Sequence, residues 1–230
     1  MTLPASNISQ TTIAYLFSGR ETITLPFYQR GYSWEIKQID ELFADILLGF
    51  KEAKEDNTVE DGYLLGNIVL LTFDRKENFL LDGQQRLTTM FLILEELKKH
   101  IPEKYAGLQS IINSAIYEVD SYGNTNEQIK IKRETKSGEL LDFGMQRKLH
   151  DYIINKVRNE LLYDEMFEEN EMIDFLLNIS FMTQKYVGHS TDTDYKNKTF
   201  KNILKYFVKF NTRGKAFDET EMTEAIALLS

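Results

Sequence analysis

The sequence predicts an α+β chain in which a small mixed sheet is flanked by helices and followed by a mainly helical portion. Residues 39–50 carry apolar side chains at i, i+3 and i+4, a spacing that is typical of an amphipathic helix. Residues 63–73 and 79–81 are apolar runs separated by a short polar turn, which predicts an antiparallel hairpin. A second helix follows from Arg86. Its apolar face comprises Leu87, Met90, Phe91, Leu94 and Leu97.

The segments before the hairpin are shorter and more polar. Residues 7–18 suit a short helix that ends at Gly19. The stretch 21–32 looks extended, and Pro26 restricts it to an edge strand or to a strand that opens into a loop. Ser33 can cap the helix that follows.

The second half of the chain is mainly helical in pattern. Helices are predicted at 144–178, at 199–210 and from Asp218 onward, and short strands at 116–120, 128–134 and 179–187. We therefore expect a core at 1–100 and a mainly helical extension at 101–230. The last predicted helix has barely begun where the chain stops at Ser230, so we expect a longer protein.

The composition is that of an ordinary globular chain. The 230 residues are 42% hydrophobic, which is enough to bury a sizeable core. There are no cysteines, which excludes disulfides, thiolate metal sites and cysteine nucleophiles. A net charge of −9 argues against non-specific duplex binding as the main role. We see no signal peptide and no long apolar run, so a cytoplasmic protein without a membrane span is expected.

Polar residues interrupt the apolar pattern where the hairpin ends, in FLLDGQQRLTTM (79–90). A strand, a glycine turn and a helix start present backbone N–H groups and the positive end of the helix dipole, which favour an anion such as phosphate. Arg86 can bind phosphate or carboxylate oxygens through two N–H groups. Asp82 could hold Mg²⁺ or orient a water molecule. The alternative is that Asp82 is only a helix N-cap and that Arg86 pairs with an acid.

Two further polar motifs lie at predicted element ends. LPFYQRGYSW (25–34) places aromatic residues around a Gln-Arg pair, a combination that can stack a base or line a pocket for one. Tyr32 and Trp34 are equally well explained as core anchors. KFNTRG (209–214) is either a helix-capping arrangement or a polar contact to a ligand.

Three lysines, Lys201, Lys205 and Lys209, recur every four residues along the helix that leads to this last motif. A solvated helix face is the usual explanation of such a pattern. The alternative is a DNA-binding stripe that follows backbone phosphates.

Together, four stretches resemble the domain of unknown function 262, the N-terminal module of GmrSD-type, modification-dependent restriction enzymes. The stretches are LPFYQRGYSW, LLGNIVLL, LLDGQQRLTTMFLIL and FVKFNTRGKAFDETE, in this order. The resemblance covers nearly all of the chain, although the middle, about 105–195, carries no matching motif. It implies a ParB/sulfiredoxin-like mixed domain, in which a strand, a glycine turn and an Arg-containing helix start hold nucleotide phosphates.

The resemblance also implies which residues form the site. The residues expected to act in catalysis are Asp82, Gln84, Gln85 and Arg86, with Asp82 as the metal ligand. Those expected to bind the nucleotide are Gly83, Arg86, Leu87, Thr88, Tyr28, Gln29 and Arg30. Those expected to close the cleft, returned to the core by the helical extension, are Asn211, Arg213 and Gly214.

The function that the resemblance implies is an NTP-binding and NTP-hydrolysing sensor domain of a bacterial restriction system that acts against phage through modified DNA. GTP is the favoured nucleotide, and Mg²⁺ is the expected cofactor. Full-length relatives carry an HNH-type nuclease in a separate C-terminal domain. The three histidines, His100, His150 and His189, are dispersed and match no such centre, so cleavage is not expected in 1–230. The alternatives are a non-catalytic DNA-recognition module and a partner-docking or homo-oligomerisation domain.

Overall fold

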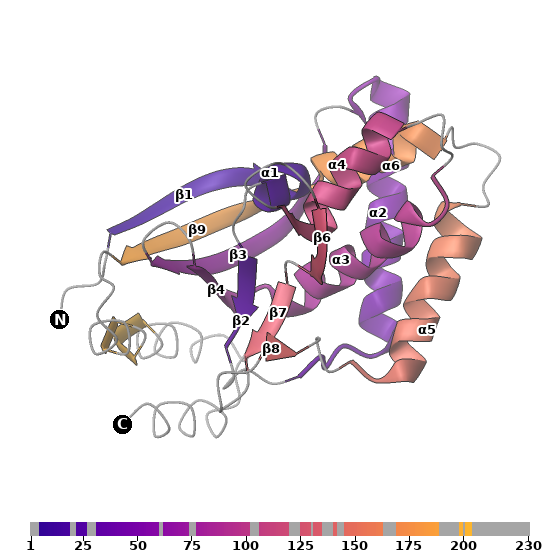
Figure 1. Cartoon of the computed structure of the whole chain (residues 1–230). Coiled ribbons are helices and arrows are strands. Elements are labelled where there is room, and N and C mark those ends of the chain that lie inside the picture. Colours follow the sequence, from indigo (N-terminus) through magenta and orange to yellow (C-terminus); the bar gives the residue numbers. More distant parts are fainter. Residues whose placement is uncertain are drawn as a thin grey trace.

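The structure is a computed structural model, and the part of the chain that it describes is residues 5–18, 22–26, 31–59, 62–73, 77–101, 106–119, 125–129, 131–134, 140–141, 145–162, 169–188, 198–199 and 201–203. It is α+β, as predicted, with a mixed sheet and a group of helices packed beside it (Figure 1). None of the helices in the described ranges is long and apolar enough to cross a membrane.

The main sheet has seven strands in the order β1-β9-β3-β4-β2-β7-β8. Their bounds are β1 Ala5–Thr12, β9 Ser180–Gly188, β3 Leu64–Phe73, β4 Glu77–Asp82, β2 Thr22–Leu25, β7 Ile131–Glu134 and β8 Leu140–Leu141. The predicted hairpin is confirmed, because β3 and β4 pair antiparallel. On its other side β3 pairs parallel with β9, and β2 pairs parallel with both β4 and β7. The strands β5 Tyr117–Val119 and β6 Thr125–Ile129 form a separate pair.

The helices α2, α3, α5 and α6 gather on one side of this sheet (Figure 1). The helix bounds are α1 Ile13–Ser18, α2 Ile36–Asp56, α3 Gln84–Lys98, α4 Ala106–Ile116, α5 Arg147–Lys156 and α6 Glu169–Asn178, with a π-helical turn η3 at Val157–Leu161. The amphipathic patterns predicted both α2 and α3, and their apolar faces are buried in one core. In that core the rings of Phe50 and Phe175 pack edge to face, 5.3 Å between centroids.

Strand β3 is apolar along its whole second half because both of its faces are covered. Ile68 and Leu70 belong to the main core beneath the helices. Val69 and Leu71 belong to a second cluster, on the other face, which also contains Ile203 from the helical residues 201–203. The described part of the predicted helix 199–210 therefore covers the second face of the sheet.

Two predictions near the N-terminus are wrong. Residues 7–12 belong to strand β1 rather than to a helix, since they pair in register with β9, and only Ile13–Ser18 are helical. Ser33 does not cap α2. That helix begins after Glu35, which forms a capping box with Gln38 and whose N–H donates to the Gln38 side-chain oxygen at 3.0 Å.

Pro26 directly follows β2, and β2 lies between β4 and β7. The strand is therefore not an edge strand, and Pro26 lies just beyond its end.

In the second half the predicted strands are present, although 128–134 is divided between β6 and β7. Helices α5 and α6 confirm the helical pattern of 144–178. The predicted helix from Asp218 lies outside the described residues. The boundary near residue 100 stays a prediction, and the main sheet takes strands from both sides of it.

Candidate functional site

The junction between β4 and α3, residues 82–86, is called the DGQQR seam here. It contains a glycine that no other residue could replace without strain. Gly83 has φ 90° and ψ 8°, in the left-handed region, and it is the N-cap of α3. A Cβ added to it would lie 2.5 Å from Cγ2 of Ile68 and 3.1 Å from the carbonyl oxygen of Asn67. The first hydrogen bond of the helix runs from the Leu87 N–H to the Gly83 carbonyl, at 3.0 Å. The strand, glycine turn and helix start that the sequence predicted are therefore present, and the helix begins two residues before Arg86.

Asp82 is the last residue of β4, and it lies opposite Val69 just beyond an irregularity in the β3–β4 pairing. It is not the N-cap of α3, as one alternative held, because Gly83 takes that position. The residue is exposed, yet enough protein surrounds its carboxyl group that desolvation raises the pKa of Asp82. The Gly83 N–H and the charge of Arg86 oppose this change. Asp82 is thus a carboxyl group at the surface whose charged form the fold partly disfavours.

Arg86 lies on the first turn of α3 with its guanidinium group against Gly66 of β3. A Cβ added to Gly66 would lie 3.1 Å from Nη1, 3.3 Å from Cζ and 3.7 Å from Nε of Arg86. Arg86 takes part in none of the ion pairs formed between described residues, so its predicted pairing with an acid is not seen there. The side chain is partly exposed, so its N–H groups remain accessible to an anion.

Gln85, the neighbour of Arg86, holds the chain that follows the YQR motif. Its Oε1 accepts the backbone N–H groups of Ser33 at 2.9 Å and Trp34 at 3.4 Å, and its Nε2 donates to the Gly31 carbonyl at 3.4 Å. The first turn of α3 and the segment Gly31–Trp34, defined here as the aromatic segment, are therefore tied together. These contacts favour a positioning role for Gln85.

A second tie runs through Tyr32, whose hydroxyl lies 2.7 Å from Oγ1 of Thr89. Burial raises the pKa of Tyr32 to about 12, against the effect of this hydrogen bond. Trp34 is half-buried and packs against the core, edge to face with Tyr32 at 6.5 Å between centroids. Both aromatic residues are core anchors, so the structure does not support stacking of a base on Tyr32.

Three other residues of the motif point inward. Gln84 has an exposed fraction of 8%, Leu87 of 0% and Thr88 of 1%. Leu87 belongs to the main core, and the Thr88 hydroxyl has no hydrogen-bond partner in the described part of the chain. The structure therefore supports packing rather than direct nucleotide contact for the Leu87 and Thr88 side chains.

Several predicted site residues lie outside the described residues. They are Tyr28, Gln29, Arg30, Lys205, Lys209, Asn211, Arg213 and Gly214. Of the three lysines, Lys201 is described, half-buried and helical. The structure thus joins the DGQQR motif to the residues directly after YQR, and to β3 through Gly66.

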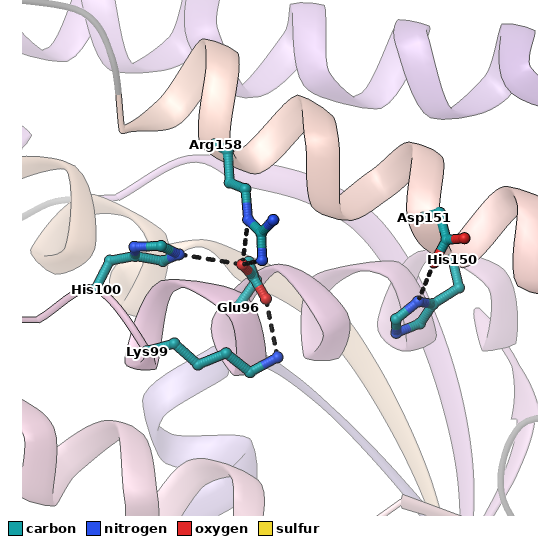
Figure 2. Close-up of polar contacts among 6 residues, drawn as sticks. All are labelled: Glu96, Lys99, His100, His150, Asp151 and Arg158. Carbon is teal, nitrogen blue, oxygen red and sulfur yellow. Dashed lines mark hydrogen bonds and ion pairs between the residues drawn. The ribbon is translucent and has the colours of Figure 1, made fainter.

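One polar cluster was missed in the sequence. Glu96, near the end of α3, has no exposed surface and accepts hydrogen bonds or ion pairs from Lys99, His100 and Arg158, as Figure 2 shows. Arg158 lies on η3 and reaches Oε1 of Glu96 through Nε and Nη2, both at 2.6 Å. Burial alone would raise the pKa of Glu96, but these partners outweigh it and lower the pKa to about 2. The only signal in the sequence was an acid within a run of apolar residues.

His100 is part of this cluster, and His150 lies beside Asp151 on α5 (Figure 2). Each of the two thus lies beside a neighbouring acid, and His189 lies outside the described residues. Within the described ranges, no three His, Cys, Asp or Glu side chains are placed to hold a metal ion. Asp82 is a described carboxylate at this site that could hold Mg²⁺ together with ligand oxygens and water, which is a common arrangement for this ion.

Comparison with known proteins places these motifs in one family. The sequence profile of the GmrSD restriction endonuclease N-terminal domain matches residues 13–228. No curated protein matches the chain. The match includes β2, the hairpin, the DGQQR seam and the C-terminal NTRG motif, and it spans nearly the whole chain. The chain belongs to the family of GmrSD restriction endonuclease N-terminal domains.

Proposed function

We propose that this domain binds a nucleoside triphosphate at the start of α3 and hydrolyses it with Mg²⁺ as cofactor. The observation that carries the proposal is the geometry of the seam, where left-handed Gly83 opens a fifteen-residue helix. Arg86 lies on its first turn and forms no ion pair with a described residue. The N–H groups of a first helical turn have no acceptor within the helix, and the helix dipole adds positive potential there. A phosphate group accepts hydrogen bonds from these N–H groups, and its negative charge is favoured by this potential.

The residues at this seam divide the chemistry between them. Arg86 binds phosphate oxygens and offsets the negative charge that develops during phosphoryl transfer. Asp82 accepts a hydrogen bond from an attacking water molecule or binds the cation that accompanies the phosphates. Gln85 holds the aromatic segment against the first turn of α3 and so keeps the residues after YQR beside the site. Mg²⁺ supplies charge neutralisation at the phosphate oxygens.

We propose further that the nucleotide state of this domain regulates a nuclease that lies in another part of the restriction system. Membership in a restriction endonuclease family supports this assignment. Modified phage DNA is the signal that the proposal assigns to the system, and GTP is its favoured nucleotide. Gel shifts on modified and unmodified DNA, with and without nucleotide, test the DNA role. A shift that is selective for modified DNA supports it, and no shift under any condition contradicts it.

Nucleotide binding itself is tested by titrating fluorescent analogues of GTP, ATP, CTP and UTP with Mg²⁺ and by measuring phosphate release. The variant Asp82→Ala/Arg86→Ala should lose binding and turnover. A matched control is Arg147→Ala/Asp151→Ala, which removes the same residue types at the same spacing from an exposed helical pair. The control should keep wild-type values. Equal activity of the two double variants, or no binding by the wild-type protein, would contradict the proposal.

A further inference from the structure

We infer that Gly66 is a positioning residue for Arg86, whose guanidinium group lies against the backbone of Gly66 and is thereby held ready for the phosphates. This inference rests on the proposed function, since it explains how the phosphate-binding side chain is oriented. Gly66 belongs to the stretch LLGNIVLL. The proposed function gives roles to residues of the DGQQR motif but none to this stretch.

The backbone at Gly66 is unusual in two ways. Its φ is 140°, a conformation that side chains of L-residues rarely adopt. The pairing of β3 with β9 also shifts register between Leu64 and Gly66. Irregularities of this kind are enriched next to functional sites, where they change the direction of a strand or of a side chain. On this backbone, a side chain at position 66 would point at the guanidinium group of Arg86.

The contact with Arg86 explains why this position has no side chain. The added Cβ would lie between 3.1 and 3.7 Å from three atoms of the guanidinium group, Nη1, Cζ and Nε. These distances place the planar group across the glycine rather than end-on to it. A free arginine side chain has a large rotamer entropy, part of which is lost when it binds a ligand. A surface that fixes the guanidinium plane before the ligand arrives reduces this entropy loss on binding.

Packing against Gly66 also leaves the N–H groups of Arg86 available to bind a phosphate. A carboxylate partner would fix the side chain equally well, but it would occupy the N–H groups that a phosphate needs. Packing on a glycine backbone fixes the guanidinium plane and uses none of them. The ion pairs within the described ranges leave Arg86 out, in agreement with this arrangement.

A double-mutant cycle tests the inference. Gly66→Ala should weaken nucleotide binding about tenfold in the wild-type background, since it displaces one charge-assisted contact. In an Arg86→Lys background the same change should alter the affinity by no more than about twofold, because lysine has no planar group to seat. Equal losses in the two backgrounds would show that Gly66 acts on stability alone and would overturn the inference.

A nucleotide-independent measurement separates this inference from the proposed function. In ¹⁵N spectra of the protein without nucleotide, Gly66→Ala should shift the Arg86 Nε–H resonance, which is assigned from its loss in Arg86→Lys. Gly107→Ala is the control, because a Cβ added to this exposed glycine of α4 meets no atom within 4 Å. It should leave this resonance in place. An unmoved resonance in Gly66→Ala would overturn the positional role even if nucleotide binds, and a moved resonance without nucleotide binding would contradict only the proposed function.

Discussion

Asp82 is a residue whose ionisation works against the stability of the fold. Its pKa is raised, chiefly by desolvation, so the folded state binds this proton more tightly than the unfolded state does. The stability that follows from this is present at low pH and is lost as pH rises through the folded-state pKa. At neutral pH the charged carboxylate therefore costs stability. Such a cost is common for groups that are kept for function.

We accordingly predict that Asp82→Asn leaves thermal stability at pH 7 unchanged or raises it, while nucleotide hydrolysis falls about 100-fold or more. The asparagine oxygen can still accept the Gly83 N–H, so the local backbone should be kept. Differential scanning fluorimetry across pH and phosphate release measure the two effects. The stability difference should vanish below the ordinary aspartate range. A variant that is less stable at pH 7 with full activity would show a purely structural carboxylate.

Gln85 allows a prediction with a built-in probe, because Trp34 is the only tryptophan of the chain. Removing the amide in Gln85→Ala leaves the N–H groups of Ser33 and Trp34 without their acceptor. We expect a loss of about 0.5–1.5 kcal/mol in the free energy of unfolding and a red shift of the Trp34 emission. Urea denaturation followed by fluorescence measures both. Gln146→Ala changes an exposed glutamine that makes no side-chain cap and should show neither effect.

At the scale of elements, the cluster around Glu96 connects the end of α3 to η3. The lowered pKa of Glu96 means that the cluster contributes stability above the ordinary value of 4.5, and that this contribution is lost as pH falls toward about 2. We predict that Glu96→Gln destabilises the fold by about 1–3 kcal/mol at pH 7, since Arg158 loses its charged acceptor. Guanidinium chloride unfolding at pH 7 and near pH 2 should show the difference only at the higher pH.

The control for this prediction is Glu41→Gln. Glu41 forms an exposed pair with Lys37, with side-chain exposures of 62% and 80%. Exposed pairs contribute about 0.2–1 kcal/mol at most, so this variant should resemble the wild type. A Glu96→Gln variant with the same small effect at both pH values would show that the cluster does not hold α3 and η3 together.

The elements also show which features local sequence could predict. Helices α2 and α3 and the β3–β4 hairpin carry strong periodic patterns, and all were predicted. Strand β1 was mistaken for a helix because its exposed residues alternate too weakly to reveal a partner, and that partner, β9, lies about 170 residues away along the chain. The contact between Gly66 and Arg86 spans a shorter distance along the chain, but it too could not be predicted locally, since it depends on how β3 pairs with β4.

In the candidate site too, features set by neighbouring residues could be predicted, and contacts between residues far apart in the chain could not. The glycine turn and the helix start at Gly83 were predicted from neighbouring residues, because a strand, a glycine and a helical pattern follow one another directly. The hydrogen bonds by which Gln85 holds the aromatic segment could not be predicted in this way, since its partners lie 51 to 54 residues earlier in the chain. Burial of Leu87 followed from the predicted apolar face of the helix. Burial of Thr88, which was expected to bind the nucleotide, did not, and only the structure shows it.

At the scale of the whole molecule, the sheet ties the two halves of the chain into one core. Strand β9 lies between β1 and β3, and Phe175 and Phe181 from the second half are fully buried in the main core with Phe50. Burying a phenylalanine side chain contributes about 1.5–3 kcal/mol, and a folded domain is stable by only about 5–15 kcal/mol. A core that loses both phenylalanines together with its central strand partner loses a large part of that stability.

We therefore predict that residues 1–100 alone do not fold, although they contain the whole DGQQR seam. Without β9, strand β1 loses its partner in the sheet and β3 keeps only β4. Far-UV circular dichroism and urea titration should show a weakly structured chain without a cooperative transition, whereas residues 1–230 should unfold cooperatively. Mixing 1–100 with 101–230 should restore structure if the halves are one folding unit. Cooperative unfolding of 1–100 by itself would instead establish an independent core, with the later strands added to its edges.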